Sequence, residues 1–426
     1  MKHYKGILFS LLIIIILGGC VSQKGTKFTK KISASLDNVF FENHFKGILI
    51  YDPVSRDTLF RKNSTKYFTP ASNTKIYTLF AALKLLPEKL PVLKYVLQND
   101  TLYITGTADG TQLHPYFRDS TGLKFLKSYD NISLYHNNTE DEKFGPGWSW
   151  DDYHWYYSAE RNALPLYGNV VTIANIPQLT ILPEIFSDSV VRVSFSRNRE
   201  PNHNTFYFDP DRKDTIEIPF ITTKGLTKKL LEQAVGKTIS LSEQIPATKQ
   251  KILYGIPSDS VYQRMMQKSD NFLAEQLLIQ ASSSLSDTLS GRRVREYVLD
   301  SLLPDLRQQP RWVDGSGLSR YNLFSPESIV HVLNRMYSEI PRERLFSLFA
   351  AGGASGTLEG WYPGNPDPYI YAKTGSLGNN HSVSGYLITK SGKTLIFSFM
   401  NNHFRQDVSE IKMQMQQLFE WVRDNY

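Results

Sequence analysis

A serine and a lysine lie three residues apart in the stretch YFTPASNTKIYTL, where Ser72 and Lys75 follow Pro70 at the start of a segment with helical apolar spacing. A serine hydroxyl is a poor nucleophile until a base removes its proton. Because residues i and i+3 share one helix face, Lys75 can serve as that base if its amine is neutral. Alone, the pattern favours an ordinary helix start with Lys75 in water, and Ser409 and Lys412 repeat the spacing without evident purpose.

Two further motifs follow in chain order. Ser269 and Asn271 belong to KSDN, beside or within a helical segment, and Lys373, Thr374 and Gly375 belong to AKTGSL, at the start of an expected strand. The ordered set S-x-x-K, S-D-N and K-T-G is the signature of penicillin-binding proteins and class A β-lactamases. The three motifs together therefore favour a catalytic serine over a helix cap.

The residue types suit an acyl transfer. Burial and a nearby second cation, Lys373, would both lower the pKa of Lys75 and so help to make it basic. Ser269 can relay a proton to the leaving amine, and Asn271 can hold the substrate amide. We therefore predict that Ser72 is the nucleophile and Lys75 its base.

The third motif predicts the substrate-binding edge. Lys373 and Thr374 offer a cation and a hydroxyl to a carboxylate, and Gly375 would let the substrate lie along the strand as an added β-strand. The backbone N–H groups of Ser72 and Ser376 would hold the oxyanion. An acyl donor with a free carboxylate, such as a peptide ending in D-Ala-D-Ala, fits this arrangement.

Five segments carry a wider resemblance: PASNTKIYT, KSDNFLAEQLL, VDGSGLSRYNLFSP, ASGTLEG and AKTGSL. They resemble the class C low-molecular-mass penicillin-binding proteins, the D-alanyl-D-alanine carboxypeptidase/endopeptidase family. The resemblance implies a transpeptidase domain like that of serine β-lactamases, with a β-rich domain inserted between the first two motifs. It also implies that peptidoglycan stem peptides are substrates and that β-lactams are inhibitors. The insertion is too short for two full accessory domains.

The segment WSWDDYHWYYSAERNALPLYGN within the insertion also resembles that family. There the corresponding stretch approaches the active site, so the resemblance implies that Asp152 binds the free amine of a diamino acid in the stem peptide. The residues alone favour a different interpretation, in which Asp151 and Asp152 form a solvated turn beside packed aromatic side chains.

The chain order of the expected elements predicts one α/β (α+β) catalytic domain made of distant segments, 33–86 and 247–426. Residues 47–63 predict two strands around a turn, 381–402 predict a second hairpin, and 406–426 predict a helix with one apolar face. Residues 87–246 contain short strand-like segments between turn residues and predict an inserted, mostly β region.

The first residues predict export and lipidation. Residues 1–19 have two lysines before a short apolar run, as in a signal peptide, and LGGC resembles the lipobox of bacterial lipoproteins. Cys20, the single cysteine, would carry the lipid, and residues 20–32 would be a tether. The expected location is the periplasmic side of the cell envelope, with the outer membrane favoured over the inner.

The overall composition is that of a globular protein, with 41% hydrophobic and 21% charged residues. The formal net charge of +7 comes from dispersed residues, and no basic run interleaved with aromatics predicts nucleic-acid binding. The histidines form no H-E-x-x-H pair, so we expect neither a metal nor a cofactor. Two other functions remain open: a serine β-lactamase or esterase, and a catalytically idle penicillin-binding scaffold.

Overall fold

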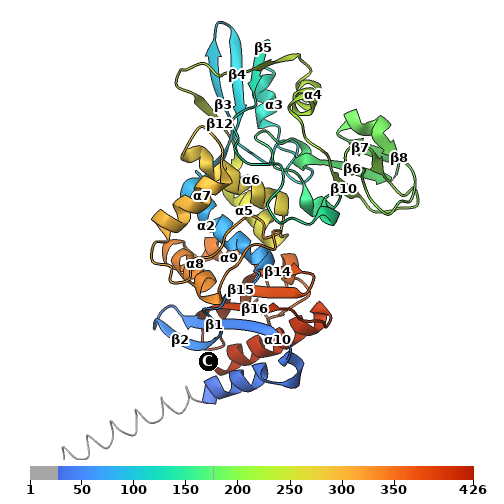
Figure 1. Ribbon diagram of the computed structural model, residues 1–426. Coiled ribbons are helices and arrows are strands. Elements are labelled where there is room, and N and C mark those ends of the chain that lie inside the picture. Colours follow the sequence, from blue (N-terminus) through green and yellow to red (C-terminus); the bar gives the residue numbers. More distant parts are fainter. Residues whose placement is uncertain (1–26, 176) are drawn as a thin grey trace, which may run out of the picture.

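The computed structural model describes residues 27–175 and 177–426. The predicted signal peptide, Cys20 and the first part of the predicted tether lie outside these residues. The described chain has a lower part, which contains both ends, and an upper part, built mostly from the segment between α2 and α5 (Figure 1).

The lower part is built on an antiparallel six-stranded sheet in the order β13-β14-β15-β16-β1-β2. The expected hairpins are confirmed: one pairs β1 with β2, and the other pairs β15 with β16. Strand β1 also pairs with β16, which joins the N-terminal hairpin to the C-terminal one. The strands are β1 (Phe45–Asp52), β2 (Asp57–Lys62), β13 (Ala350–Ala351), β14 (Ile370–Leu377), β15 (Asn380–Ile388) and β16 (Thr394–Asn402).

One face of this sheet is covered by α10 (Val408–Asn425) and by a helix whose described residues are 27–36 (Figure 1). The sequence places residues 27–32 in a tether, but here they are helical. Phe28, Ile32 and Leu36 recur every fourth residue and are buried in the same cluster as the apolar face of α10. The helix therefore belongs to the folded domain.

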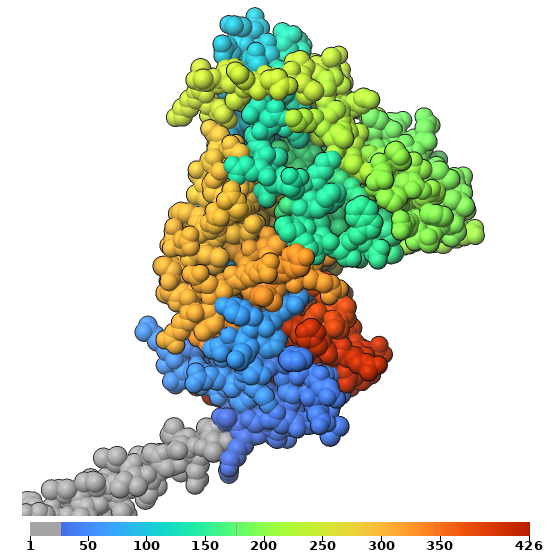
Figure 2. Space-filling model, in the orientation of Figure 1, coloured from blue at the N-terminus to red at the C-terminus, as the bar shows by residue number. Residues whose placement is uncertain are grey.

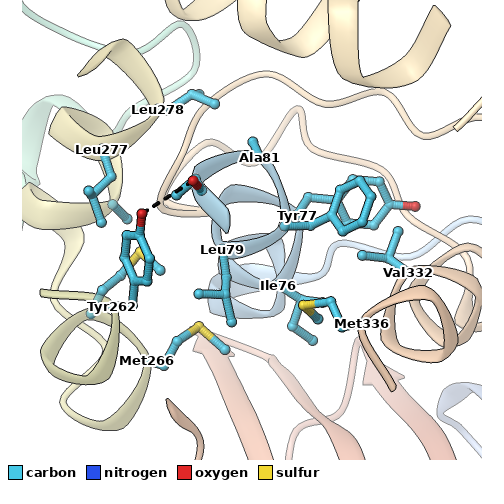
Figure 3. Packing of buried hydrophobic residues seen from close by; sticks show 14 of the residues in the cluster. Ile76, Tyr77, Leu79, Ala81, Tyr262, Met266, Leu277, Leu278, Val332 and Met336 are labelled. Carbon is cyan, nitrogen blue, oxygen red and sulfur yellow. Dashed lines mark hydrogen bonds between the residues drawn. The ribbon is translucent and has the colours of Figure 1, made fainter. Parts of the chain in front are cut away.

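The other face carries a layer of helices around α2 (Lys75–Leu85). Helix α2 is apolar on most of its circumference, and Ile76, Leu79 and Phe80 are fully buried. Figure 3 shows residues of the neighbouring helices around it, including Tyr262 and Met336. The neighbours are α5 (Ser258–Gln267), α6 (Asn271–Ala281), α7 (Gly291–Tyr297), α8 (Pro326–Glu339) and α9 (Arg342–Leu348).

The upper part contains a mixed five-stranded sheet in the order β11-β5-β4-β3-β12. Its last strand lies beyond residue 246, where the sequence places the end of the insertion, yet it pairs with β3. The strands are β3 (Lys89–Gln98), β4 (Thr101–Gly106), β5 (Asn131–Tyr135), β11 (Ile239–Ser242) and β12 (Lys251–Pro257). Two helices that the sequence did not predict, α3 (Thr121–Leu126) and α4 (Lys224–Val235), pack into the same core.

A side lobe carries two smaller sheets (Figure 1). Its strands are β6 (Val170–Asn175), β7 (Leu179–Leu182), β8 (Val190–Val191), β9 (Phe206–Tyr207) and β10 (Ile216–Pro219). A search of the described residues finds no helix that is both long and apolar enough to cross a membrane.

Candidate active site

Ser72 and Lys75 lie where a short 3-10 turn, Ala71–Thr74, passes into α2. Lys75 is completely buried, so the interpretation in which it faces water is wrong. Its Nζ lies 3.0 Å from Ser72 Oγ. The local spacing therefore brings nucleophile and base into contact, as the sequence predicts.

Lys75 Nζ has two other partners, Asn271 Oδ1 at 2.6 Å and the Ser316 carbonyl oxygen at 2.7 Å. Both oxygens accept hydrogen bonds from N–H groups of Lys75. A neutral amine has two N–H groups and one lone pair, so this arrangement leaves the lone pair for the Ser72 hydroxyl. In the ammonium form Lys75 donates to all three partners, and loss of one proton leaves the lone pair toward Ser72 Oγ, where the amine can act as a base.

The two acceptors are themselves held by buried contacts. Asn271 opens α6, and its Nδ2 donates to the Tyr157 carbonyl oxygen at 3.0 Å, which fixes Oδ1 toward Lys75. The Ser316 N–H donates to Glu275 Oε1 at 2.7 Å, and Glu275 is also paired with Arg161. Because Glu275 lies one turn after Asn271, α6 positions both contacts of the lysine.

Burial lowers the pKa of Lys75 to about 8, while the carboxylates of Asp314, Glu275 and Asp270 act in the opposite direction. The sequence predicts that burial and Lys373 both lower this pKa; burial does so, whereas Lys373 is not among the groups that shift it. The pKa of Lys373 is itself lowered well below its ordinary value, first by burial and then by the charge of Lys75. The two lysines therefore titrate as a coupled pair, in which the charge of Lys75 disfavours the charged form of Lys373.

Lys373 connects the second and third motifs. Its Nζ donates to Ser269 Oγ at 2.9 Å and to the Thr374 carbonyl oxygen at 2.7 Å. Ser269 has a positive φ of 59° in the turn between α5 and α6. The Thr374 hydroxyl donates to Thr357 Oγ1 at 2.8 Å. Ser269, Lys373 and Thr374 therefore form one hydrogen-bonded group.

Gly375 has a structural role in addition to the expected one in substrate binding. A Cβ here would lie 2.5 Å from the Pro70 carbonyl oxygen and 2.9 Å from Ser72 N, so the missing side chain makes room for the nucleophile turn. No described strand pairs with the outer edge of β14 beyond Ala372, which leaves the segment from Lys373 onward for an added strand.

Ser376 is exposed, and its Oγ lies 2.8 Å from Nδ1 of His381 on the neighbouring strand. Burial, together with the charges of Lys412 and Lys373, lowers the pKa of His381 to about 3. At neutral pH an uncharged imidazole therefore holds the Ser376 hydroxyl.

Asp152 is half-buried in the 3-10 turn Trp150–Asp152. It accepts a hydrogen bond from the Tyr157 hydroxyl at 2.9 Å, and the carbonyl of Tyr157 is the group that holds Asn271. Two hydrogen bonds through one tyrosine thus connect Asp152 with a residue that contacts Lys75. The solvated-turn interpretation fits Asp151, which is exposed, whereas Asp152 is half-buried and hydrogen-bonded to Tyr157.

Four site residues were given no role by the sequence: Tyr157, Glu275, Asp314 and Ser316. Asp314 accepts the backbone N–H groups of Gly317 and Ser319 and so shapes the loop that carries the Ser316 carbonyl. The segment VDGSGLSRYN contains this loop and contributes to the family resemblance, which was the available signal.

Comparison with known proteins supplies a family. Residues 28–185 and 221–422 match the model of the D-Ala-D-Ala carboxypeptidase 3 (S13) family. The D-alanyl-D-alanine carboxypeptidase DacB of Haemophilus influenzae is 27% identical over 179 residues, which cover 40% of this chain and 37% of that protein. The D-alanyl-D-alanine carboxypeptidase of an Actinomadura species is 22% identical over 449 residues, covering 88% and 81%. The alignment with the Haemophilus protein thus spans little more than a third of its length.

Solved structures supply the fold. The crystal structure of penicillin binding protein 4 from Haemophilus influenzae covers 92% of this chain and 99% of its own, with a TM-score of 0.72 at 18% identity. A second structure of that protein, in complex with a β-lactam, gives a TM-score of 0.64 at 16% identity. The predicted α/β penicillin-binding fold is confirmed, and so is the predicted family.

Proposed function

This chain belongs to the D-Ala-D-Ala carboxypeptidase 3 (S13) family, and we propose that it is a serine-type D,D-carboxypeptidase, D,D-endopeptidase or both, acting on peptidoglycan stem peptides. The observation that carries the proposal is the contact of Ser72 Oγ with the buried Lys75 amine, whose other partners are both acceptors. A scaffold without activity has no need for such a base.

In the proposed reaction, Ser72 Oγ attacks the carbonyl carbon of the penultimate D-alanine while its proton passes to Lys75. The peptide C–N bond then breaks, and the proton that Lys75 received passes to the leaving amine through Ser269, which Lys373 holds in place. A water molecule hydrolyses the acyl-enzyme and restores the serine. A terminal D-alanine or a cross-linked stem peptide can be the leaving group, because both reactions use one acyl-enzyme.

Substrate binding would use the strand that carries the third motif. A terminal carboxylate beside Lys373 and Thr374 would favour the protonated, charged form of Lys373. The backbone N–H groups of Ser72 and Ser376 would stabilise the oxyanion. β-Lactams would acylate the same serine, which fits the family and the β-lactam complex of the Haemophilus protein.

The test is turnover of a stem peptide that ends in D-Ala-D-Ala, followed by digestion of purified sacculi. We expect release of D-alanine, cleavage of cross-links or both, and none from Ser72→Ala. Mass spectrometry after treatment with a labelled penicillin should place the adduct on the peptide that carries Ser72. An adduct on Ser269, or a folded protein without turnover or adduct, would refute the proposal.

We further propose that the protein is a lipoprotein of the cell envelope, anchored through lipid on Cys20. It would lie on the periplasmic side, with the outer membrane favoured over the inner. The lipobox-like LGGC sequence supports this assignment. Cys20→Ser should abolish metabolic labelling with a fatty acid and leave unprocessed or released protein. Unchanged membrane retention without label would instead indicate an uncleaved anchor.

A further inference from the structure

A cleft of about 370 Å³ lies between the turn that contains Asp152 and the side lobe. Residues 150, 151 and 153–155 line one wall, and residues 196, 197, 199 and 201 line the other. In Figure 2 the teal surface that includes the first wall adjoins the green lobe that includes the second. The volume lies within the range of small-molecule sites, roughly 300 to 1,000 Å³.

Exposed indole rings belong to the first wall. Trp150 is 72% exposed and Trp155 is 43% exposed, although tryptophan is among the side chains that proteins bury most extensively on average. Two large aromatic surfaces that remain in water beside one cleft are typical of a binding site. They offer flat apolar faces to a ligand.

Polar groups of both signs accompany these rings: Asp151, Arg197 and Arg199. The Arg199 side chain is almost fully buried, lies over the Tyr153 ring at 4.3 Å, and donates to the Glu200 carbonyl oxygen at 2.7 Å. Its Nε finds no hydrogen-bond partner among the described residues, and a buried donor of this kind is costly. A ligand that accepts this hydrogen bond, directly or through water, would remove that cost.

The two walls are connected to each other. The backbone N–H of Asn198 donates to His154 Nδ1, and the Asn198 side chain donates to the His154 carbonyl oxygen, both at 3.3 Å. Because Nδ1 accepts, the neutral ring carries its proton on Nε2 and is a further donor. The cleft thus combines aromatic faces, one carboxylate acceptor and several donors.

The cleft also has a defined relation to the catalytic residues. Asp151 lines the cleft, whereas the next residue, Asp152, binds the hydroxyl of Tyr157, whose carbonyl holds Asn271. In this short turn Asp151 therefore lies on the side of the cleft and Asp152 on the side of the catalytic residues. The second wall lies within residues 186–220, which the family model does not match, whereas the first wall lies within the matched residues.

We propose that this cleft binds an N-acetylated amino sugar of the glycan strand to which the stem peptide is attached. A sugar ring has apolar C–H faces that pack on indole rings, and hydroxyl and amide groups that need both donors and acceptors. A carboxylate-rich peptide could pair with Arg197, but it would meet Asp151. It would also leave the exposed indole faces of Trp150 and Trp155 without an apolar partner. This inference rests on the proposed function in one respect: peptidoglycan is taken as the polymer that contains the sugar. Binding of the sugar itself is argued from the cleft alone.

Binding is tested without catalysis, by calorimetric titration of the Ser72→Ala protein with an N-acetylglucosamine tetramer and, separately, with free stem peptide. We expect the tetramer to bind and Trp155→Ala to weaken its binding on the order of 10-fold. Tyr254→Ala is the matched control, because Tyr254 is 45% exposed on β12 and does not line the cleft. Circular dichroism and Tm check that each variant is folded.

Kinetics supply the second readout, the ratio of kcat/KM for a disaccharide-linked stem peptide to kcat/KM for the same peptide without sugar. We expect a ratio above one that falls toward one in Trp155→Ala and is retained in Tyr254→Ala. Absence of tetramer binding, or loss of stem-peptide binding in Trp155→Ala, would overturn the saccharide assignment. If the tetramer binds but the wild-type protein, with Ser72 intact, shows no hydrolase activity, the proposed function is refuted and the cleft assignment stands.

Discussion

Lys75 and Lys373 are both fully buried, but their electrostatic surroundings differ. Three carboxylates, those of Asp314, Glu275 and Asp270, oppose the effect of burial on the pKa of Lys75, whereas Lys373 experiences burial and the positive charge of Lys75. The two lysines therefore differ in how readily they carry a proton. Lys75 titrates near the operating pH, which suits a general base.

Acylation is expected to rise with pH and to level off above an inflection near pH 8. The base must be unprotonated to act, and the unprotonated fraction of Lys75 increases as the pH passes its pKa of about 8. Stopped-flow measurement with a fluorescent penicillin between about pH 6 and about pH 9.5 gives the profile. Lys75→Ala should lower the rate by at least about 10²-fold and remove the inflection. A rate that is flat or falls over this range would contradict the role of Lys75.

Glu275→Gln should move that inflection to lower pH. The carboxylate raises the pKa of Lys75, while the amide oxygen of glutamine can still accept the Ser316 N–H. A structural defect alone would lower the rate at every pH without moving the inflection. An unmoved inflection in a folded variant would mean that Glu275 already carries a proton at that pH.

How far the sequence predicts the site depends on how local each contact is. Ser72 and Lys75 meet because they lie three positions apart, within one turn, so the spacing is sufficient. The contact of Lys75 with Ser316 joins residues 241 positions apart, and no local pattern indicates it. The burial that sets the pKa of Lys75 is likewise a property of the whole helix layer.

The same distinction applies to the fold. Both hairpins are local in sequence and were predicted from alternation and turn residues. The pairing of β12 with β3 bridges the whole insertion, so the predicted boundary fell before β12. In residues 27–32, exposed lysines obscured the spacing of Phe28 and Ile32, whose partners come from the far end of the chain.

Gly375→Ala is expected to impair both folding and acylation. The new methyl group would lie 2.5 Å from the Pro70 carbonyl oxygen and force the Ser72 turn away from β14. We expect a loss of about 1 to 3 kcal/mol in the free energy of unfolding and a fall in acylation on the order of 10²-fold. Urea denaturation and labelled penicillin measure the two effects.

Gly225→Ala is the matched control for that substitution. Its Cβ would have one neighbour, Thr223 Oγ1 at 4.0 Å, in the first turn of α4. Alanine should be neutral or slightly stabilising there. Normal acylation and stability in Gly375→Ala would show that the turn can move without cost.

Asp152→Asn is expected to lower kcat/KM for a stem peptide that contains diaminopimelate by roughly 10- to 100-fold, the scale of a charge-assisted hydrogen bond of about 1.5 to 3 kcal/mol. Asp152 is half-buried beside Tyr157, so its carboxylate is partly desolvated where the side-chain amine would bind. Acylation by penicillin, which has no such amine, should be nearly unchanged.

The matched substrate for this prediction is the same peptide with its side-chain amine acetylated. The wild-type enzyme should discriminate against the acetylated peptide by the same factor that Asp152→Asn loses, and the variant should barely distinguish the two peptides. Tyr157→Phe retains the charge of Asp152 but removes the hydrogen bond that orients it, and should therefore show an intermediate loss. If Asp152→Asn weakens both peptides and penicillin equally in a folded protein, Asp152 supports the turn that positions Asn271 and does not recognise the amine.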